Sequence, residues 1–275
     1  PFLVEPLMTP RLLAFAGSLR EGSYNKKLVR IAAEGAREAG AEVTAVEVAK
    51  QSAAIVLLDK HLAVIADGVR LGRQTFANTL KYIGITTSAN FGNMVSMAIA
   101  TPLLPFLPLA AKQILLNNFL SDIPSVFIST DNVDPDRLNR AQRWRVADVQ
   151  RFMIVFVLLS TVFDLATFAL LLKVFGADQA VFQTTWFVVS LLTELAVLLV
   201  LRTHGPAIRS RPSTVLLWST VAVAGLALAF PWLGPVASAF SFVPLPLSIA
   251  AAAIGIVTAY VLSTELVKAW FFRQR

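Results

Sequence analysis

Residues 152–175, with the sequence FMIVFVLLSTVFDLATFALLLKVF, decide the class of fold. Only Asp164 and Lys173 carry a charge in this stretch. A helix that crosses a bilayer needs about 20 mostly apolar residues, so the stretch predicts a transmembrane helix. The whole chain of 275 residues shares this bias, with 56% hydrophobic residues, 15% charged residues and a mean hydropathy of +0.67. Soluble domains average about 45–50% apolar and about 25% charged residues. The composition therefore excludes disorder and argues against a water-soluble globule.

Five further apolar runs of membrane-spanning length accompany this one. The six predicted spans are Ile83–Leu104, Leu109–Ile128, Phe152–Phe175, Val181–Leu201, Thr214–Leu233 and Leu245–Trp270. The first two are the most polar, and Pro102, Pro105 and Pro108 turn the chain between them. The predicted fold class is an all-α polytopic membrane protein with six transmembrane helices.

The positions of the basic residues predict the orientation of these spans. The chain has 24 Lys and Arg against 17 Asp and Glu, which gives a net charge of +7. With the N-terminal segment in the cytoplasm, 22 of the 24 basic residues fall in residues 1–82, the loops 129–151 and 202–213, and the end of the chain. This bias is typical of the positive-inside rule, and the arginines would face anionic lipid headgroups. We expect a multi-pass protein of the plasma membrane with both termini cytoplasmic, whose partner is the lipid bilayer and not nucleic acid.

The N-terminal segment, residues 1–47, has a different pattern. A strand at Leu12–Ala16, a helix over Lys26–Ala39 and a strand over Glu42–Val48 are predicted in turn. The run Gly17–Leu28, GSLREGSYNKKL, resembles the opening of NADPH-dependent FMN reductases of the flavodoxin-like fold. The resemblance implies a small β-α-β fragment, and the residues that match the flavin-phosphate ligands are Ser18, Arg20, Ser23 and Asn25. Because the parts that hold the flavin ring are absent, bound FMN is not expected.

A second resemblance begins near Val48 and covers the rest of the chain. It is carried by AKQSAAIVLLD at Ala49–Asp59, SANFGN at Ser88–Asn93, LLNNFLSDI at Leu115–Ile123 and PLPLS at Pro244–Ser248. Together these motifs resemble magnesium-translocating P-type ATPases. The resemblance implies that residues 48–82 are the end of the phosphorylation domain and the stalk. It also implies that residues 83–275 are the six-helix C-terminal transmembrane domain, equivalent to helices five to ten of the pump.

The motifs of ATP hydrolysis are missing from these residues. The only Asp-Lys pair, Asp59-Lys60, continues His61-Leu62 instead of Thr-Gly, and there is no Walker P-loop. The sequence also has no cysteine, which excludes thiolate chemistry. We therefore expect no catalytic residue and no ATP site. The expected function is a truncated membrane domain of a magnesium pump, inactive alone or working with the missing pump domains in trans. The alternatives are a membrane-tethered FMN reductase and a purely structural membrane bundle.

Polar residues in the first two predicted spans form the candidate cation site. Asn118, Ser121 and Asp122 are spaced i, i+3, i+4 and share a helix face, and Asn90 and Asn93 are three residues apart. Mg²⁺ takes oxygen ligands and keeps several waters, and carboxamide and carboxylate oxygens are suitable ligands. The alternative interpretation is that these amides only join helices by hydrogen bonds.

The pump resemblance places the family's ion site at these positions and makes Asp122, Asn118 and Asn90 the Mg²⁺ ligands. Part of that site comes from the fourth helix of the pump, so Mg²⁺ binding by this chain should be weak. An unpaired charge at mid-membrane costs at least about 2.5 kcal/mol, so we expect Asp122 to point into the bundle toward Asn90 and Asn93. Asp164 and Glu194, in the third and fourth spans, are weaker candidates for the same site.

Overall fold

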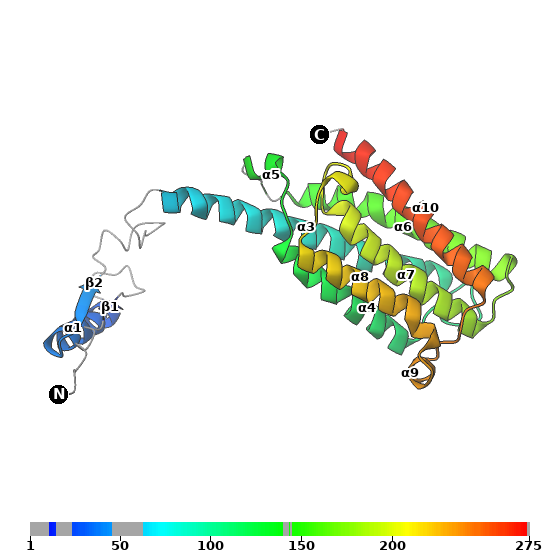
Figure 1. Ribbon diagram of the computed structural model, residues 1–275, viewed down its shortest axis with the longest axis horizontal. Helices are drawn as coiled ribbons and strands as arrows, with labels where there is room; N and C mark the ends of the chain where they lie inside the picture. Colours follow the sequence, from blue (N-terminus) through cyan, green and yellow to red (C-terminus); the bar gives the residue numbers. More distant parts are fainter. Residues whose placement is uncertain (1–10, 15–23, 46–62, 140–142, 144, 274–275) are drawn as a thin grey trace, which may run out of the picture. The chain divides into compact units, whose positions relative to one another are not determined.

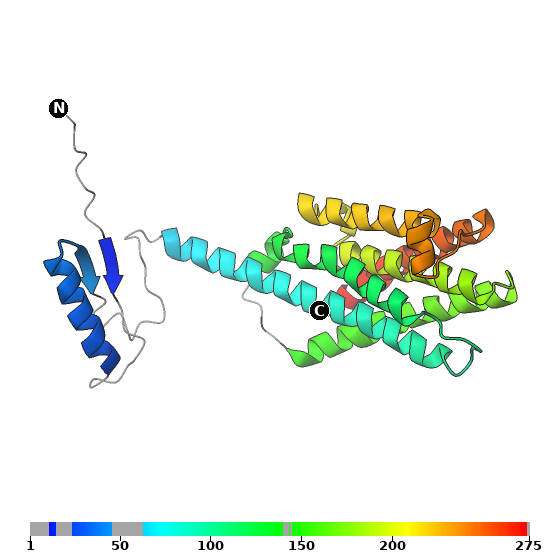
Figure 2. The same cartoon turned by 90° about the horizontal axis from the view of Figure 1, so that it is seen from below.

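The computed structural model describes residues 11–14, 24–45, 63–139, 143 and 145–273 (Figures 1 and 2). The chain divides into two compact units, residues 1–67 and residues 68–275.

The N-terminal unit contains two short parallel strands and one helix. Strand β1 (Arg11–Ala14) pairs with β2 (Glu42–Ala45), with Arg11 opposite Glu42, and α1 (Tyr24–Glu38) connects them. Gly40 has a φ of +89°, and the bonds Gly40 N–Arg37 O and Ala41 N–Ala36 O, both 2.9 Å, close the end of α1 in a Schellman motif. Leu28 and Ile31 of α1 are each 66% exposed. Two strands and one helix therefore leave the apolar face of α1 uncovered.

The second unit begins within a long helix, α3 (Ala63–Ala100), which joins the predicted stalk and the first predicted span without a break. Its buried positions carry small or polar residues with the exception of Ile85. They are Ala77, Asn78, Lys81, Gly84, Ile85, Ser88, Gly92, Ser96 and Ala100. At Gly92 a Cβ atom would lie 3.2 Å from Ser160 Oγ of the neighbouring helix. Small residues permit this close approach of helices, as at many interfaces in membranes.

Helix α4 (Ala111–Val126) follows and continues through Pro124 before a 3₁₀ turn, Phe127–Thr130, ends it. At its start, the Gln113 side chain accepts a 3.0 Å bond from the Ala110 N–H. Gln113, Asn117, Ser121 and Ser125 recur every four residues and are all buried, so they form a polar stripe along the inner side of α4.

The other elements complete a helical bundle (Figure 1). They are α5 (Pro135–Asn139), α6 (Val146–Lys173), α7 (Gln179–Leu201), a 3₁₀ turn (Ala207–Arg209), α8 (Thr214–Ala229), a 3₁₀ turn (Phe230–Trp232), α9 (Pro235–Ala239) and α10 (Leu247–Arg273). Side-chain caps fix the first residues of two of these helices, α7 and α8. The Asp178 carboxylate accepts from Val181 N at 2.8 Å, and the Ser213 hydroxyl accepts from Leu216 N at 3.2 Å.

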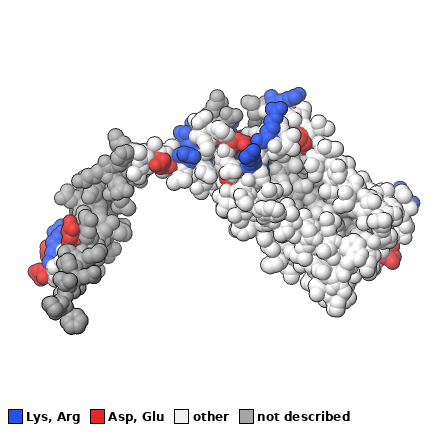
Figure 3. All heavy atoms as spheres, in the orientation of Figure 1, with Lys and Arg blue, Asp and Glu red and all other residues white. Residues whose placement is uncertain are grey.

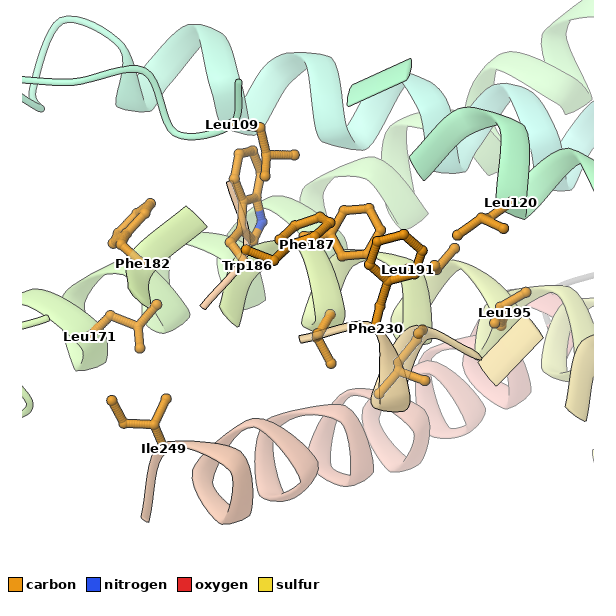
Figure 4. Packing of buried hydrophobic residues seen from close by; sticks show 14 of the residues in the cluster. Leu109, Leu120, Leu171, Phe182, Trp186, Phe187, Leu191, Leu195, Phe230 and Ile249 are labelled. Atoms are coloured by element: carbon orange, nitrogen blue, oxygen red, sulfur yellow. The ribbon is translucent and has the colours of Figure 1, made fainter. Parts of the chain in front are cut away.

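Helix α7 is the centre of the bundle and packs against α4, α6, α8 and α10. Its most apolar segment is 89% buried, compared with 22% for that of α10. The side chains that fill the core around it include Phe182, Trp186, Phe187 and Leu191, and Figure 4 shows them among residues of the neighbouring elements. The helices around α7 therefore shield both its apolar residues and its buried polar residues, such as Gln183 and Glu194, from the surroundings of the bundle.

Four helices among the described residues are long and apolar enough to cross a membrane: Val146–Lys173, Gln179–Leu201, Thr214–Trp232 and Leu247–Arg273. On the face of the bundle seen in Figure 3, uncharged atoms cover the middle, and charged atoms gather mainly at the end that carries α5 and the C-terminus. The fold is thus an α-helical membrane domain. Helix α4 has only 16 residues and α3 carries many Thr, Ser and Asn residues, so the first two of the six spans remain a prediction.

Candidate functional site

A buried carboxylate held by carboxamides lies where α3, α4 and α7 meet. Glu194 of α7 is 8% exposed. The Nδ2 of Asn93 donates to Glu194 Oε1, and the Nδ2 of Asn117 donates to Glu194 Oε2 at 3.4 Å. The Ser121 hydroxyl lies near this carboxylate and donates to the carbonyl oxygen of Asn118 at 3.1 Å. In the part of the chain that the structure describes, no Lys or Arg side chain pairs with Glu194, so an ionised carboxylate there has no internal counter-charge.

A small cavity of about 20 Å³ adjoins Glu194. Its lining includes Asn90, Ser121 and Ser125, and this volume is enough for one water molecule. The Oδ1 of Asn117 is buried without a hydrogen-bond partner. Carboxylate, carboxamide and hydroxyl oxygens therefore meet around a space of ion or water size. Oxygen ligands of this kind suit a hard cation such as Mg²⁺.

The orientation expected for Asp122 is wrong for this chain. The side chains of Asp122 and Asn118 are exposed, whereas Ser121, the neighbour of Asp122, is buried. Successive helix residues point about 100° apart, and the other helices cover the side of α4 that carries Asn117 and Ser121. Asn90 is also exposed but lines the cavity, and Asn93 is half-buried at Glu194.

Asp164 of α6 forms a second buried polar centre. Its residue is 4% exposed, and its carboxylate accepts from Ser96 Oγ at 2.6 Å and from Trp186 Nε1 at 3.0 Å. Ser96 lies on α3 and Trp186 on α7, so Asp164 connects three helices. Both of the weaker sequence candidates, Asp164 and Glu194, are therefore more buried than Asp122.

A third carboxylate, Asp131, lies at the end of the bundle that carries α5, and the sequence did not single it out as a site residue. Its side chain is fully buried and pairs with Lys81 Nζ at 2.7 Å and with Arg202 at 3.4 Å. Ser213 N also donates to Asp131 Oδ1 at 3.2 Å. Burial lowers the pKa of Lys81, and the bond to Asp131 opposes this shift. This ion cluster ties α3 to the loops that follow α4 and α7.

The predicted flavin-phosphate loop lies largely outside the described residues. This applies to Ser18, Arg20 and Ser23, and Asn25 lies in the first turn of α1. Among the described residues no group of three His, Cys, Asp or Glu could hold a metal ion. A cation at Glu194 would thus depend on amide and hydroxyl oxygens as well as on the carboxylate.

The fold defines a helical membrane domain with buried carboxylates between its helices. In agreement with this class, the family described as "Cation transporting ATPase, C-terminus" matches residues 106–270, which is more than half of the chain. The chain belongs to this family. A second family, "NADPH-dependent FMN reductase", matches residues 10–78.

Individual relatives agree with the first match. The "Magnesium-transporting ATPase, P-type 1" of Escherichia coli (strain K12) is 42% identical over 235 residues, which cover 84% of this chain and 26% of that protein. The protein of the same name from Salmonella typhimurium (strain LT2) is 41% identical over 84% of this chain and 26% of its own length. A "Calcium-transporting ATPase" of Bacillus subtilis (strain 168) is 31% identical over 37% of this chain and 12% of its own length. The chain thus spans about a quarter of the length of the magnesium-transporting relatives.

Proposed function

We propose that this chain forms the membrane part of a magnesium-transporting P-type ATPase and contributes part of its cation site. The observation that carries the proposal is Glu194, a buried carboxylate bonded to the amides of Asn93 and Asn117. A structural role alone would be served better by a neutral side chain, because a buried charge without a partner is costly in a membrane. Relatives that cover most of this chain are named for magnesium transport, which favours Mg²⁺ as the ion.

We infer that the exposed polar residues beside this centre are the outer part of the same site. Asn90, Asn118 and Asp122 are exposed, and Asn90 lines the cavity next to Glu194. Facing lipid, Asp122 would be costly. A further helix of the pump, in the same or in another polypeptide, would cover these residues and add ligands. Because this ligand set is incomplete, we expect the 275 residues alone to bind Mg²⁺ only weakly, through Asp122, Asn118 and Asn90.

The membrane arrangement is part of the proposal. Helices α3 and α4 act as the two remaining spans, which gives six spans in total. The protein lies in the plasma membrane, and both of its termini are cytoplasmic. The position of 22 of the 24 basic residues supports this orientation. Reporter fusions after Arg140 and after Asp178 should report cytoplasm and exterior respectively, and the opposite pattern would refute the topology.

The test of the site is a Mg²⁺ titration of the purified chain in detergent, read out as the shift in its unfolding temperature. Glu194→Gln and Asp122→Asn should each weaken the Mg²⁺ dependence. Asp178→Asn is the matched control, because asparagine also caps a helix and Asp178 lies at the far end of α7. A Mg²⁺ response that both site variants leave unchanged would show that the site is misassigned.

A flavin reductase is the second candidate function, and the family match to residues 10–78 is the observation that favours it. The fragment has only two strands among its described residues, and one uncovered helix. We expect the purified protein to lack the visible absorbance of FMN, even after incubation with it. We also expect no ATP hydrolysis above a mock preparation, because these residues lack the aspartate motif that forms the phosphoenzyme. Stoichiometric bound flavin would establish the second function.

A further inference from the structure

The end of the bundle near α5 contains a cavity of about 570 Å³ that no part of the cation site uses. Its size is that of a small-molecule site. Two kinds of wall enclose it. One wall is basic, with Arg137, Arg143 and Arg145 from the segment between α4 and α6. The other wall is apolar, with Phe152 of α6 and Phe271 and Phe272 of α10.

The basic wall has an excess of positive charge. Among the described residues, Asp148 is the acidic residue that lines the cavity together with the three arginines, and Asp134 also attracts Arg137. Lys81 lines it too, but its charge is compensated by Asp131 at 2.7 Å. The Arg73 side chain of α3 donates a 2.8 Å bond to the carbonyl oxygen of Leu138, next to Arg137. The cavity therefore offers positive charge to an anion. Guanidinium groups favour phosphate oxygens because their paired N–H groups match them.

The apolar wall is built from aromatic rings at the ends of two membrane-spanning helices. Phe271 packs edge-on against Phe152 at 5.9 Å and against Phe272 at 5.2 Å between ring centroids. Helix α10 has 27 residues, or about 40 Å, which exceeds the hydrocarbon thickness of about 30 Å. Trp270, which is 55% exposed, lies beside these rings, as is typical of the membrane interface. The cavity thus lies at the depth of the lipid headgroups.

We propose that this cavity binds the headgroup phosphate of an anionic phospholipid, with the first part of an acyl chain along Phe152 and Phe271. The three arginines supply the charge, and the aromatic wall supplies the apolar contact that a free anion would not use. A site for an acidic protein domain would need the basic wall but not the apolar one, so the lipid fits both walls. The proposal is independent of the identity of the transported ion.

The experiment measures lipid retention by the purified full chain, using native mass spectrometry after equilibration with phosphatidylglycerol and phosphatidylcholine of equal chain length. We expect one phosphatidylglycerol to be retained in preference to phosphatidylcholine. Arg143→Gln/Arg145→Gln should reduce this preference about 25-fold, since each basic residue near the surface contributes about fivefold. Both side chains are exposed, so the fold should survive, which the unfolding temperature in phosphatidylcholine alone would verify.

The matched control is Arg209→Gln/Arg211→Gln. It removes the same charge from a second basic loop, outside the lining of this cavity. We expect it to leave the preference nearly unchanged. Equal losses in both double variants would overturn the proposal and show a general surface attraction. Competition by inorganic phosphate alone at equal concentration would show a free-phosphate site, and absence of any preference in the wild type would refute the site outright.

Discussion

Asp131 and Glu194 are both buried carboxylates, but their surroundings differ. Asp131 lies between Lys81 and Arg202 at one end of the bundle, and a backbone N–H completes its bonds. Glu194 lies among the spans and is bonded to the neutral amides of Asn93 and Asn117. Asp131 has its counter-charge inside the protein, whereas among the described residues no basic side chain pairs with Glu194. This difference is the reason that we propose a structural role for Asp131 and a cation-binding role for Glu194.

The largest expected effect is the loss of Asp131. Asp131→Asn leaves Lys81 and Arg202 buried together without an anion, and breaking a buried pair in this way costs about 3–5 kcal/mol. We expect the variant to unfold at a much lower temperature in detergent or to fail to accumulate. Glu194→Gln should remain as stable as the wild type when no divalent cation is present. Equal destabilisation by both substitutions would contradict the distinction between the two carboxylates.

Asp164 is a third buried carboxylate to compare, because its partners are neutral donors, a hydroxyl and an indole N–H. Ser96→Ala removes a 2.6 Å hydrogen bond to this carboxylate, which should cost about 1–3 kcal/mol of stability. Ser129→Ala is a suitable control, because the Ser129 hydroxyl is exposed and bonds only to a nearby carbonyl oxygen, that of Val126. Similar unfolding temperatures for the two variants would show that Asp164 gains little from Ser96.

Glu194→Gln should have its main effect on the response to Mg²⁺. Binding to the native state at tenfold its Kd stabilises by about 1.4 kcal/mol, and the neutral variant should lose most of this gain. Unfolding temperatures measured with increasing Mg²⁺, and with Na⁺ at the same ionic strength, give the readout. A full Mg²⁺ response in Glu194→Gln would place the ion elsewhere.

The smallest expected effect is the pH-dependent contribution of Asp134 to stability. Asp134 lies outside the predicted spans. Burial raises the pKa of Asp134, but hydrogen bonds from Thr203 and Ser210 outweigh this and lower it below the ordinary 3.8. Its stabilising contribution is therefore present above about pH 3.8 and is lost as the pH falls through the lower pKa of the folded state. Asp134→Asn should destabilise by about 1 kcal/mol near neutral pH. The difference from the wild type should shrink on acidification, and a difference that does not change with pH would contradict this account.

The apolar runs predict the membrane helices well, because length and hydropathy are properties of each segment alone. The run Phe152–Phe175 corresponds to α6, and Val181–Leu201 falls within α7. The side chains of the site are harder to predict, because a single residue of offset along a helix exchanges an inward position for an outward one. This is the reason that Ser121 is buried where Asp122 was expected.

The sequence of α4 contains one signal that indicates which residues face the site. Gln113, Asn117, Ser121 and Ser125 form the four-residue polar stripe of α4, and this spacing identifies its inner side. The stripe would have favoured Asn117 over Asn118 as the residue near Glu194. The pairing of Asp131 with Lys81 and Arg202 could not be predicted, since it joins segments 50 and 71 residues apart in the chain.

The enclosed position of α7 has a consequence for biosynthesis. Its neighbours α8 and α10 follow it in the chain, so α7 leaves the ribosome before two of the helices that surround it exist. During that interval the side of α7 that they later cover faces either lipid or the insertion machinery. Only the arrival of α10, which packs along α7, completes the enclosure. Until α10 has been synthesised, the central helix is therefore incompletely enclosed.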